Sequence, residues 1–154
     1  MKNPLLKEIC MVTKKNKKVV GLVEVVFVKG TAGKVKKKAL FDTGATRTSV
    51  DVKVAAKAGI GPIISSVKIK NASAPRGYTR RAVAKAKIIV KGEEINTAVN
   101  IEDREGLPYP ILIGRDVIHK NFLIDVSKSH KTFKVGDAKD DKERRRLARL
   151  TKRK

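Results

Sequence analysis

The sequence is poor in the residues that build disulfides and metal sites. Its 154 residues include one cysteine, Cys10, and two histidines, His119 and His130. An internal disulfide needs two cysteines, and a common zinc site needs about four cysteine or histidine ligands. The sequence therefore predicts neither feature, and we expect no metal ion and no other cofactor.

Long apolar runs are also missing. No stretch reaches the roughly 18 apolar residues that a membrane span needs, and lysines flank the short apolar patch at residues 9–12, so the apolar centre of a secretory signal is absent. We therefore expect a cytoplasmic protein without a membrane span. Glutamine and tryptophan do not occur and lysine is abundant, which is typical of proteins from thermophilic organisms.

Acidic residues are few compared with basic ones. The chain has 15 Asp and Glu against 37 Lys and Arg, a formal net charge of +22. Residues 139–154 hold nine basic and three acidic residues, a net of +6, which leaves +16 on residues 1–138. Such a surface attracts nucleic acid, anionic membrane or acidic protein, or it is a solvated coat that confers solubility. For the tail, a solvated segment and a basic helix that binds nucleic acid or a ribosomal surface are both open.

Apolar residues occur in short runs that turn residues separate. Many short strands with turns at regular spacing indicate an all-β closed sandwich or barrel. We expect one domain at residues 19–136, between a basic N-terminal segment at 1–18 and a basic tail at 137–154. The expected strands are 19–28 and 35–41, joined by a turn at 30–33; 63–69 and 82–90, joined by a turn at 71–77; and 48–50, 95–101, 111–113, 122–126 and 132–135, the last two paired, with short helices at 52–58, closed by Gly59, and 114–118.

The strongest chemical motif is Asp42-Thr43-Gly44-Ala45. It comes directly after an apolar strand and is followed by a strand of Thr, Ser and Val. A carboxylate on a tight turn, a glycine that lets backbone approach a substrate and a threonine hydroxyl that fixes the turn are the parts of an aspartic peptidase loop. The motif alone also fits an ordinary turn between two strands.

A second motif, Ile111-Leu112-Ile113-Gly114-Arg115-Asp116, follows some seventy residues later. In this order, and with a glycine-bearing hairpin between them, the two motifs resemble those of the retropepsins, the retroviral aspartic proteases. The resemblance covers about residues 19–135. The chain is similar as well to the retropepsin-like domain of eukaryotic DNA-damage-inducible ubiquitin-shuttle proteins, through Leu123-Ile124-Asp125-Val126, and to bacterial retropepsin-like proteins encoded near peptide-ligase genes.

The resemblance implies a closed β-barrel with a flap hairpin and one short C-terminal helix, active as a homodimer. Aspartic peptidases need two carboxylates, because one ionises to activate water while the other stays protonated to polarise the scissile carbonyl. Asp42 is the one aspartate in such a loop; Asp51, Asp103, Asp116 and Asp125 lie in other contexts. A twofold dimer would supply the second carboxylate.

Family roles carry over to matching positions. The resemblance implies that Asp42 holds the lytic water, Thr43 braces the two loops, and Gly44 contacts substrate backbone. Ala45 would form the floor of a pocket that Val50 and Ile113 line. The flap tip would be Ala74, Pro75, Arg76 and Gly77, and the dimer or structural residues would be Gly114, Arg115 and Asp116.

The chain departs from the viral pattern after Ala45. Many viral enzymes have an aspartate there that binds substrate backbone and pairs with the arginine of the second motif. This chain has Thr46 and Arg47 instead, which we expect to contact the substrate, and Arg115 loses the aspartate partner. Arg47, Arg76, Arg80 and Arg81 would form a positive rim, which predicts acidic or extended polar substrates.

A second hypothesis is a nucleic-acid- or ribosome-associated protein that keeps the protease fold for dimerisation. Fold alone does not separate the two functions. The intact set Asp42, Thr43 and Gly44 favours an aspartic endopeptidase acting on a peptide or protein, because a pure binding module does not need it.

Overall fold

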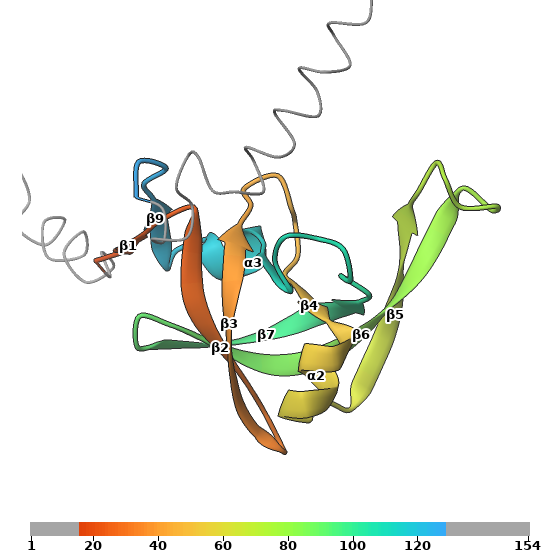
Figure 1. The fold of residues 1–154 in the computed structure, drawn as a ribbon, viewed down its shortest axis with the longest axis horizontal. Coiled ribbons are helices and arrows are strands. Elements are labelled where there is room, and N and C mark those ends of the chain that lie inside the picture. Colours follow the sequence, from red (N-terminus) through yellow and green to blue (C-terminus); the bar gives the residue numbers. More distant parts are fainter. Residues whose placement is uncertain (1–15, 129–154) are drawn as a thin grey trace, which may run out of the picture.

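Strands dominate the computed structural model, which describes residues 16–128 (Figure 1). Two short helices interrupt them. In chain order the elements are β1 (Lys18–Val20), β2 (Val23–Gly30), β3 (Gly33–Phe41), β4 (Ser49–Asp51), α2 (Val52–Ala58), β5 (Ile63–Lys70), β6 (Tyr78–Val90), β7 (Glu93–Glu102), β8 (Ile111–Ile113), α3 (Arg115–Ile118) and β9 (Phe122–Ile124).

The main sheet closes on itself. Its strand order is β2-β3-β8-β4-β7-β6-β5, and β2 also pairs with β6, so six strands form a ring and β5 stays outside it. The 13-residue strand β6 is long enough for its two parts to pair with different strands. Its C-terminal part pairs with β2 in the barrel, and its N-terminal part pairs with β5 in a hairpin that projects from the barrel (Figure 1). The predicted all-β closed barrel with a flap hairpin is confirmed.

The barrel interior is filled by small aliphatic side chains. Alternate residues of β2 and β6 point inward, including Val26, Val28 and Ile88, which are fully buried. Burial of each such side chain contributes about 1.5–3 kcal/mol. Phe41 and Phe122 pack edge to face at 6.0 Å between ring centroids and 83° between planes, and this contact joins the end of β3 to β9.

The helix predicted at residues 52–58 has those bounds. Asp51 caps its N-terminus, because its carboxylate accepts a hydrogen bond from the Lys53 amide. Gly59 ends the helix with φ of 69°, in the left-handed region that glycine adopts without strain. A Cβ at Gly59 would also lie 2.5 Å from the Ala32 backbone nitrogen, so glycine is required both by its φ and by the close approach of the β2–β3 turn.

Three strand predictions are wrong in detail, and one of them is the strand expected at 82–90, which begins at Tyr78. The strand expected at 19–28 is split into β1 and β2 at Gly21 and Leu22, because Gly21 passes directly against the Lys128 carbonyl and its amide donates to Glu24 Oε1 at 2.8 Å. The strand expected at 122–126 ends at Ile124, and it pairs in parallel with β1, Lys18 opposite Phe122.

Other predictions fall on residues that the structure does not describe. The strand at 132–135, the basic tail at 137–154 and residues 1–15 of the N-terminal segment lie outside the described range. Within residues 16–128, no helix has the length and apolar character needed to cross a membrane.

Candidate active site

The two sequence motifs meet where β3 and β8 end. These strands are parallel neighbours, with Phe41 opposite Ile113. Asp42 and Gly114, which follow their C-terminal ends, therefore lie side by side. Three hydrogen bonds lock the segments together: the Asp42 amide donates to the Ile113 carbonyl at 2.9 Å, the Arg115 amide to the Ala45 carbonyl at 2.9 Å, and the Gly114 amide to Thr48 Oγ1 at 3.1 Å. The Asp42 loop is therefore fixed by the second motif.

The Asp42 carboxylate is oriented by its own turn. Its Oδ1 accepts a hydrogen bond from the Gly44 amide at 2.8 Å, and the Ala45 amide donates to the Asp42 carbonyl at 3.3 Å. A Cβ on Gly44 would lie 3.1 Å from the same Oδ1, so a side chain there would crowd the carboxylate. Asp42 is half-buried, while Thr43 and Gly44 are exposed. The loop thus presents one oriented carboxylate at the surface of the single chain.

Asp116 holds the surrounding segments in place. Its Oδ1 accepts from the Thr48 amide at 3.0 Å, from Thr48 Oγ1 at 2.8 Å and from the Val117 amide at 3.0 Å, and its Oδ2 accepts from Thr97 Oγ1 at 3.1 Å. One carboxylate therefore links the end of the Asp42 loop, the start of α3 and strand β7. This geometry supports a structural role for Asp116.

Arg115 donates to other groups in place of the aspartate of the viral pattern. Its Nη1 donates to the carbonyls of Thr43 at 2.9 Å and Gly44 at 3.3 Å, and its Nη2 donates to Thr46 Oγ1 at 2.9 Å. A hydroxyl at position 46 and the backbone of the loop serve instead.

A cavity of about 350 Å³ lies next to the Asp42 loop. Ala45, Thr46 and Arg47 line it, and their expected contact with a substrate stays a prediction. Val50 and Ile113, which we expected in its wall, are fully buried in the barrel core. Successive residues of a strand face opposite sides, so the prediction was off by one residue on each strand. The complete lining is Ala45, Thr46, Arg47, Ser49, Ile69, Arg81, Asn100, Glu102, Arg104 and Leu112.

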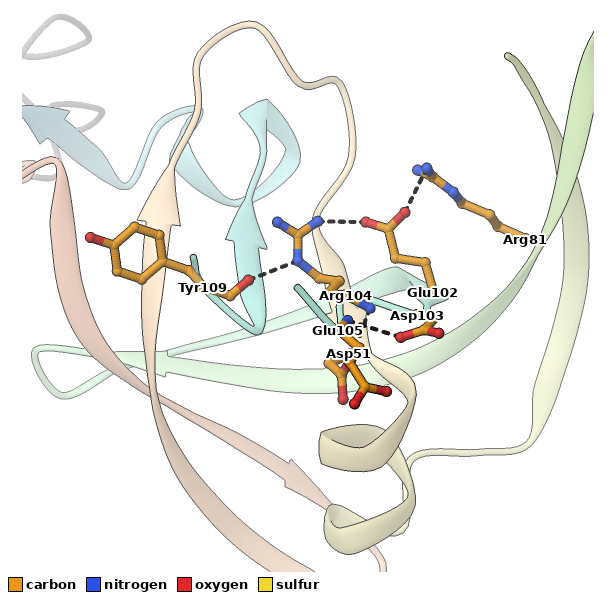
Figure 2. A network of polar contacts seen from close by, with 7 residues as sticks. All are labelled: Asp51, Arg81, Glu102, Asp103, Arg104, Glu105 and Tyr109. Atoms are coloured by element: carbon orange, nitrogen blue, oxygen red, sulfur yellow. Dashed lines mark hydrogen bonds and ion pairs between the residues drawn. The ribbon is translucent and has the colours of Figure 1, made fainter. Parts of the chain in front are cut away.

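Two arginines share one glutamate in the wall of this cavity (Figure 2). Arg81 Nη2 lies 2.6 Å from Glu102 Oε2, and Arg104 Nη1 lies 2.6 Å from Glu102 Oε1. Arg104 also donates from Nε to the Tyr109 carbonyl at 3.0 Å. Arg47 also lines the cavity, so three arginines stand against one acidic residue and the cavity has an excess of positive charge.

Asn100 adds an unusual polar atom to the same cavity. The residue is 4% exposed, and its Oδ1 has no hydrogen-bond partner among the residues that the structure describes. Leaving a buried acceptor unpaired costs about 1–3 kcal/mol. A donor from a bound molecule would remove that cost.

The network continues to Asp51, whose Oδ2 accepts from the Arg104 amide at 2.9 Å and whose Oδ1 accepts from the Lys53 amide at 2.9 Å. Burial is the largest single influence on the Asp51 carboxyl and raises its pKa. The backbone amides of Arg104, Lys53 and Val54, with the Lys53 charge, together outweigh burial and hold the pKa below its ordinary value of 3.8.

This lowered pKa predicts an acid-dependent loss of stability. Because the folded state favours ionised Asp51, its contribution is fully present above pH 3.8, the ordinary value, and is lost as the pH falls through the lower pKa of the folded protein. Asp51→Asn should reduce the free energy of unfolding at neutral pH by about 1–2 kcal/mol, and should lose less stability than the wild type on acidification. Urea unfolding at a series of pH values measures both, and an unchanged pH dependence would contradict the assignment.

The predicted flap is a hairpin with a closed tip. Beyond the last pair, Lys70 with Tyr78, the Asn71 amide donates to the Gly77 carbonyl at 3.0 Å and the Gly77 amide to the Ala74 carbonyl at 2.8 Å. Gly77 has φ of 68°, which favours glycine. Ala74, Pro75 and Arg76 thus lie at the tip, and Arg76 is exposed there. Arg80, which we also expected at the positive rim, donates from Nη1 to Ser66 Oγ at 3.2 Å.

Several cavity residues were missed by sequence reasoning. Asn100, Glu102 and Arg104 occupy alternate positions at and just after the end of β7, a spacing that places them on one side of an extended chain. That alternation was available in the sequence. Ile69 required knowledge of where the β5–β6 hairpin lies relative to the barrel, which no local pattern gives. Among the described residues, no group of three or more His, Cys, Asp or Glu is placed to hold a metal ion.

Comparison with known proteins agrees with this architecture. The family model RimB-like, described as retropepsin-like aspartic endopeptidase RimB, matches residues 49–135, a segment that includes Gly114, Arg115 and Asp116 but begins after Asp42. No curated protein sequence matches the chain.

Several solved structures have a similar fold. The EIAV protease complexed with the inhibitor HBY-793 is 21% identical, with 62% of this chain and 83% of that chain covered and a TM-score of 0.49. A protein of unknown function from Legionella pneumophila subsp. pneumophila str. Philadelphia 1 is 19% identical, with 75% and 98% covered and a TM-score of 0.50. The simian foamy virus (mac) protease is 24% identical, with 61% and 91% covered and a TM-score of 0.42.

Proposed function

The chain belongs to the RimB-like family of retropepsin-like aspartic endopeptidases, and on that premise we propose that it hydrolyses peptide bonds at a site built from Asp42 of two protomers. The observation that carries the proposal is the oriented Asp42 carboxylate, which Gly44 positions and the Gly114 segment supports. A loop that served only as a turn would not need an oriented, half-buried carboxylate in a segment that a second, distant motif holds in place.

In the proposed mechanism, the two Asp42 carboxyls share one proton, because two close carboxylates do not both stay ionised. The ionised Asp42 takes a proton from a water molecule, whose oxygen attacks the scissile carbonyl carbon. The protonated Asp42 gives its proton to the carbonyl oxygen, and a tetrahedral diol forms. The Asp42 that took a proton from water then gives it to the amide nitrogen, while the other Asp42 takes a proton from one hydroxyl of the diol. The carbon–nitrogen bond breaks, the amine and the carboxylic acid leave, and no covalent enzyme intermediate is formed.

Two features of the single chain support a dimer. Asp42 is alone in a loop of this kind, so the second carboxylate has to come from another copy. The small sheet of β1 and β9 pairs only these two strands in the described part of the chain, and exposes Val19 (39%) and Leu123 (53%). Strands with free edges and exposed apolar side chains are suited to pair with a second copy.

The charge of the cavity supports an acidic substrate. Arg47, Arg81 and Arg104 line it against the single carboxylate of Glu102. Guanidinium groups bind carboxylates through paired, charge-assisted hydrogen bonds. We therefore propose that peptides with Asp or Glu close to the scissile bond are preferred.

A peptide library tests the activity and the preference together. Peptides with Glu near the cleaved bond should have kcat/KM about 10-fold or more above matched peptides with Lys, and pepstatin should inhibit cleavage of both. Arg81→Gln should reduce the preference for Glu. Arg80→Gln is a matched control, because Arg80 is the neighbouring residue and its side chain donates to Ser66 instead. Cleavage that is indifferent to acidic residues, or that favours basic ones, would contradict the substrate proposal while leaving the peptidase proposal standing.

A further inference from the structure

Lysines gather on the outer face of the barrel, on strands β3, β2 and β6. We call the group formed by Lys29, Lys34, Lys36, Lys38, Lys85 and Lys87 the lysine face. These side chains alternate along their strands with inward residues such as Val28, Val35 and Ala86, which are buried. Lys38 and Lys87 are half-buried and the other four are exposed.

The strand register aligns these lysines in two directions. Along β3, Lys34, Lys36 and Lys38 recur every second residue, about 6.7 Å apart. Across the sheet, Lys34 is opposite Lys29, and Lys29 is opposite Lys87. Neighbouring strands are about 4.8 Å apart, so the row crosses three strands within about 10 Å. The lysine face is therefore a dense array of charge and not a scatter of single lysines.

Few acidic groups offset this charge. One acidic residue, Glu94, lies among the outward positions of the strand segments around the lysine face, and it pairs with Lys87 at 2.6 Å. These segments are residues 25–29, 34–40, 85–89 and 94–98. The hydrogen bond from Lys87 and then its charge lower the pKa of the Glu94 carboxyl, and Lys29 and Lys34 lower it further. Six positive charges thus face one negative charge, and the field of the face reaches beyond direct contacts.

The lysine face is also hollowed. A depression of about 610 Å³ lies beside β2, β6 and β7, with Lys29, Lys85 and Lys87 among its lining residues. Asn96 and Thr31 are polar residues of its lining, and Ile64 and Ala98 supply apolar surface. A volume of this size is in the range of small-ligand sites, and it is large enough to receive a nucleotide unit rather than a single ion.

The type of cation distinguishes this face from the candidate active site. Within residues 16–128 the arginines are Arg47, Arg76, Arg80, Arg81, Arg104 and Arg115, which lie in the Asp42 loop, the flap hairpin, the cavity network and α3. The lysine face contains none of them. Arginine suits planar carboxylates, whereas lysine is a flexible point charge that suits a row of phosphates.

From this arrangement we propose that the lysine face binds the phosphodiester backbone of a nucleic acid, without reading its sequence. Lys34, Lys36 and Lys38 contact successive phosphates, and Lys29, Lys85 and Lys87 hold the strand at the hollow. Phosphate neutralisation by lysine supplies most non-specific nucleic-acid affinity. The site is separate from the proposed peptidase site. Along the extended strand β3, Lys38 lies about 13 Å and Lys34 about 26 Å from Asp42.

Binding of a labelled single-stranded RNA of about 12 nucleotides to the full chain tests the proposal. The triple variant Lys34→Gln, Lys36→Gln, Lys38→Gln should bind about 10- to 100-fold more weakly at about 0.1 M salt, and the slope of log K against log salt should be shallower by about 2, at about 0.7 per lost phosphate contact. A triple variant with the same charge change, Lys57→Gln, Lys70→Gln, Lys120→Gln, is the control, because these exposed lysines lie on α2, β5 and the segment after α3. It should bind nearly as the wild type does.

Further arms identify the polyanion. A DNA strand and a DNA duplex of equal length show which nucleic acid is preferred, and each should be affected by the face variant. Equal loss in the face and control variants would overturn the proposal, because total charge would then explain the binding. So would a polyglutamate peptide that binds as tightly as RNA and is lost in the same variant. Peptide hydrolysis, measured in parallel, should be unchanged in the face variant, so this test does not depend on the proposed peptidase activity.

Discussion

Replacement of Asp42 by asparagine should reduce kcat/KM for peptide hydrolysis by about 10⁴-fold or more, because both the general base and the general acid come from this residue. The variant should fold normally. Asparagine keeps the Oδ1 atom that accepts the Gly44 amide, so the hydrogen bond that orients the turn is preserved. What is lost is the ability of the pair of side chains to hold and exchange one proton.

The matched control is Asp103→Asn. Asp103 is exposed, and its Oδ1 accepts the Glu105 amide at 2.9 Å, the same type of local turn contact that Asp42 makes with Gly44. Asparagine preserves that contact as well, so the control should keep wild-type kcat/KM. If Asp42→Asn cleaves peptides as fast as Asp103→Asn, while both have the wild-type unfolding temperature, the catalytic assignment is wrong.

Gly114→Ala should produce the largest loss of both stability and activity among the glycine substitutions near the site. Its Cβ would lie 2.6 Å from the Arg47 carbonyl carbon, 2.8 Å from the carbonyl oxygen and 2.9 Å from the backbone nitrogen. These are backbone atoms, so no flexible side chain can move aside. Relief of the overlap requires the Asp42 loop and the start of α3 to separate, which breaks the bond between the Gly114 amide and Thr48 Oγ1.

Overpacking of this kind costs about 1–3 kcal/mol of stability. The displaced loop moves the Asp42 carboxylate, so kcat should fall, and kcat/KM should therefore fall by a larger factor than KM rises. Urea unfolding and steady-state kinetics measure the two effects. Gly61→Ala is the control, because a Cβ at Gly61 meets no atom within 4 Å. A Gly114→Ala protein as stable and as active as the control would show that the two motifs are not packed as described.

Local sequence patterns accounted for most of the elements, because those elements depend on near neighbours. The helix at 52–58 follows from Asp51 as cap and Gly59 as terminator, and the Gly30–Gly33 turn follows from its residue types. The closed barrel was reached through the family resemblance and the spacing of strands. Its closure by the pairing of β2 with β6 joins residues some sixty positions apart, which no local pattern reports.

The errors have physical causes of the same kind. The split at Gly21 depends on Lys128, more than a hundred residues later, and the parallel pairing of β9 with β1 depends on how α3 returns the chain. Successive side chains of a strand point to opposite faces, so an error of one position selects a residue on the wrong face. Val50 and Ile113 were expected in the cavity wall, but their neighbours Ser49 and Leu112 line it. Partner choice was equally non-local: Thr46 could be recognised as an acceptor for Arg115 only when both were placed.

Subunit mixing tests the shared site most directly. Wild-type chains and Asp42→Asn chains are refolded together in equal amounts, and the activity per wild-type chain is compared with that of wild type refolded alone at the same total concentration. A site that needs Asp42 from both protomers predicts that this activity falls to about one half, because about half of the wild-type chains then pair with an inactive partner. Activity per wild-type chain that stays unchanged at every mixing ratio, in material whose mass in solution is that of a dimer, would contradict the account.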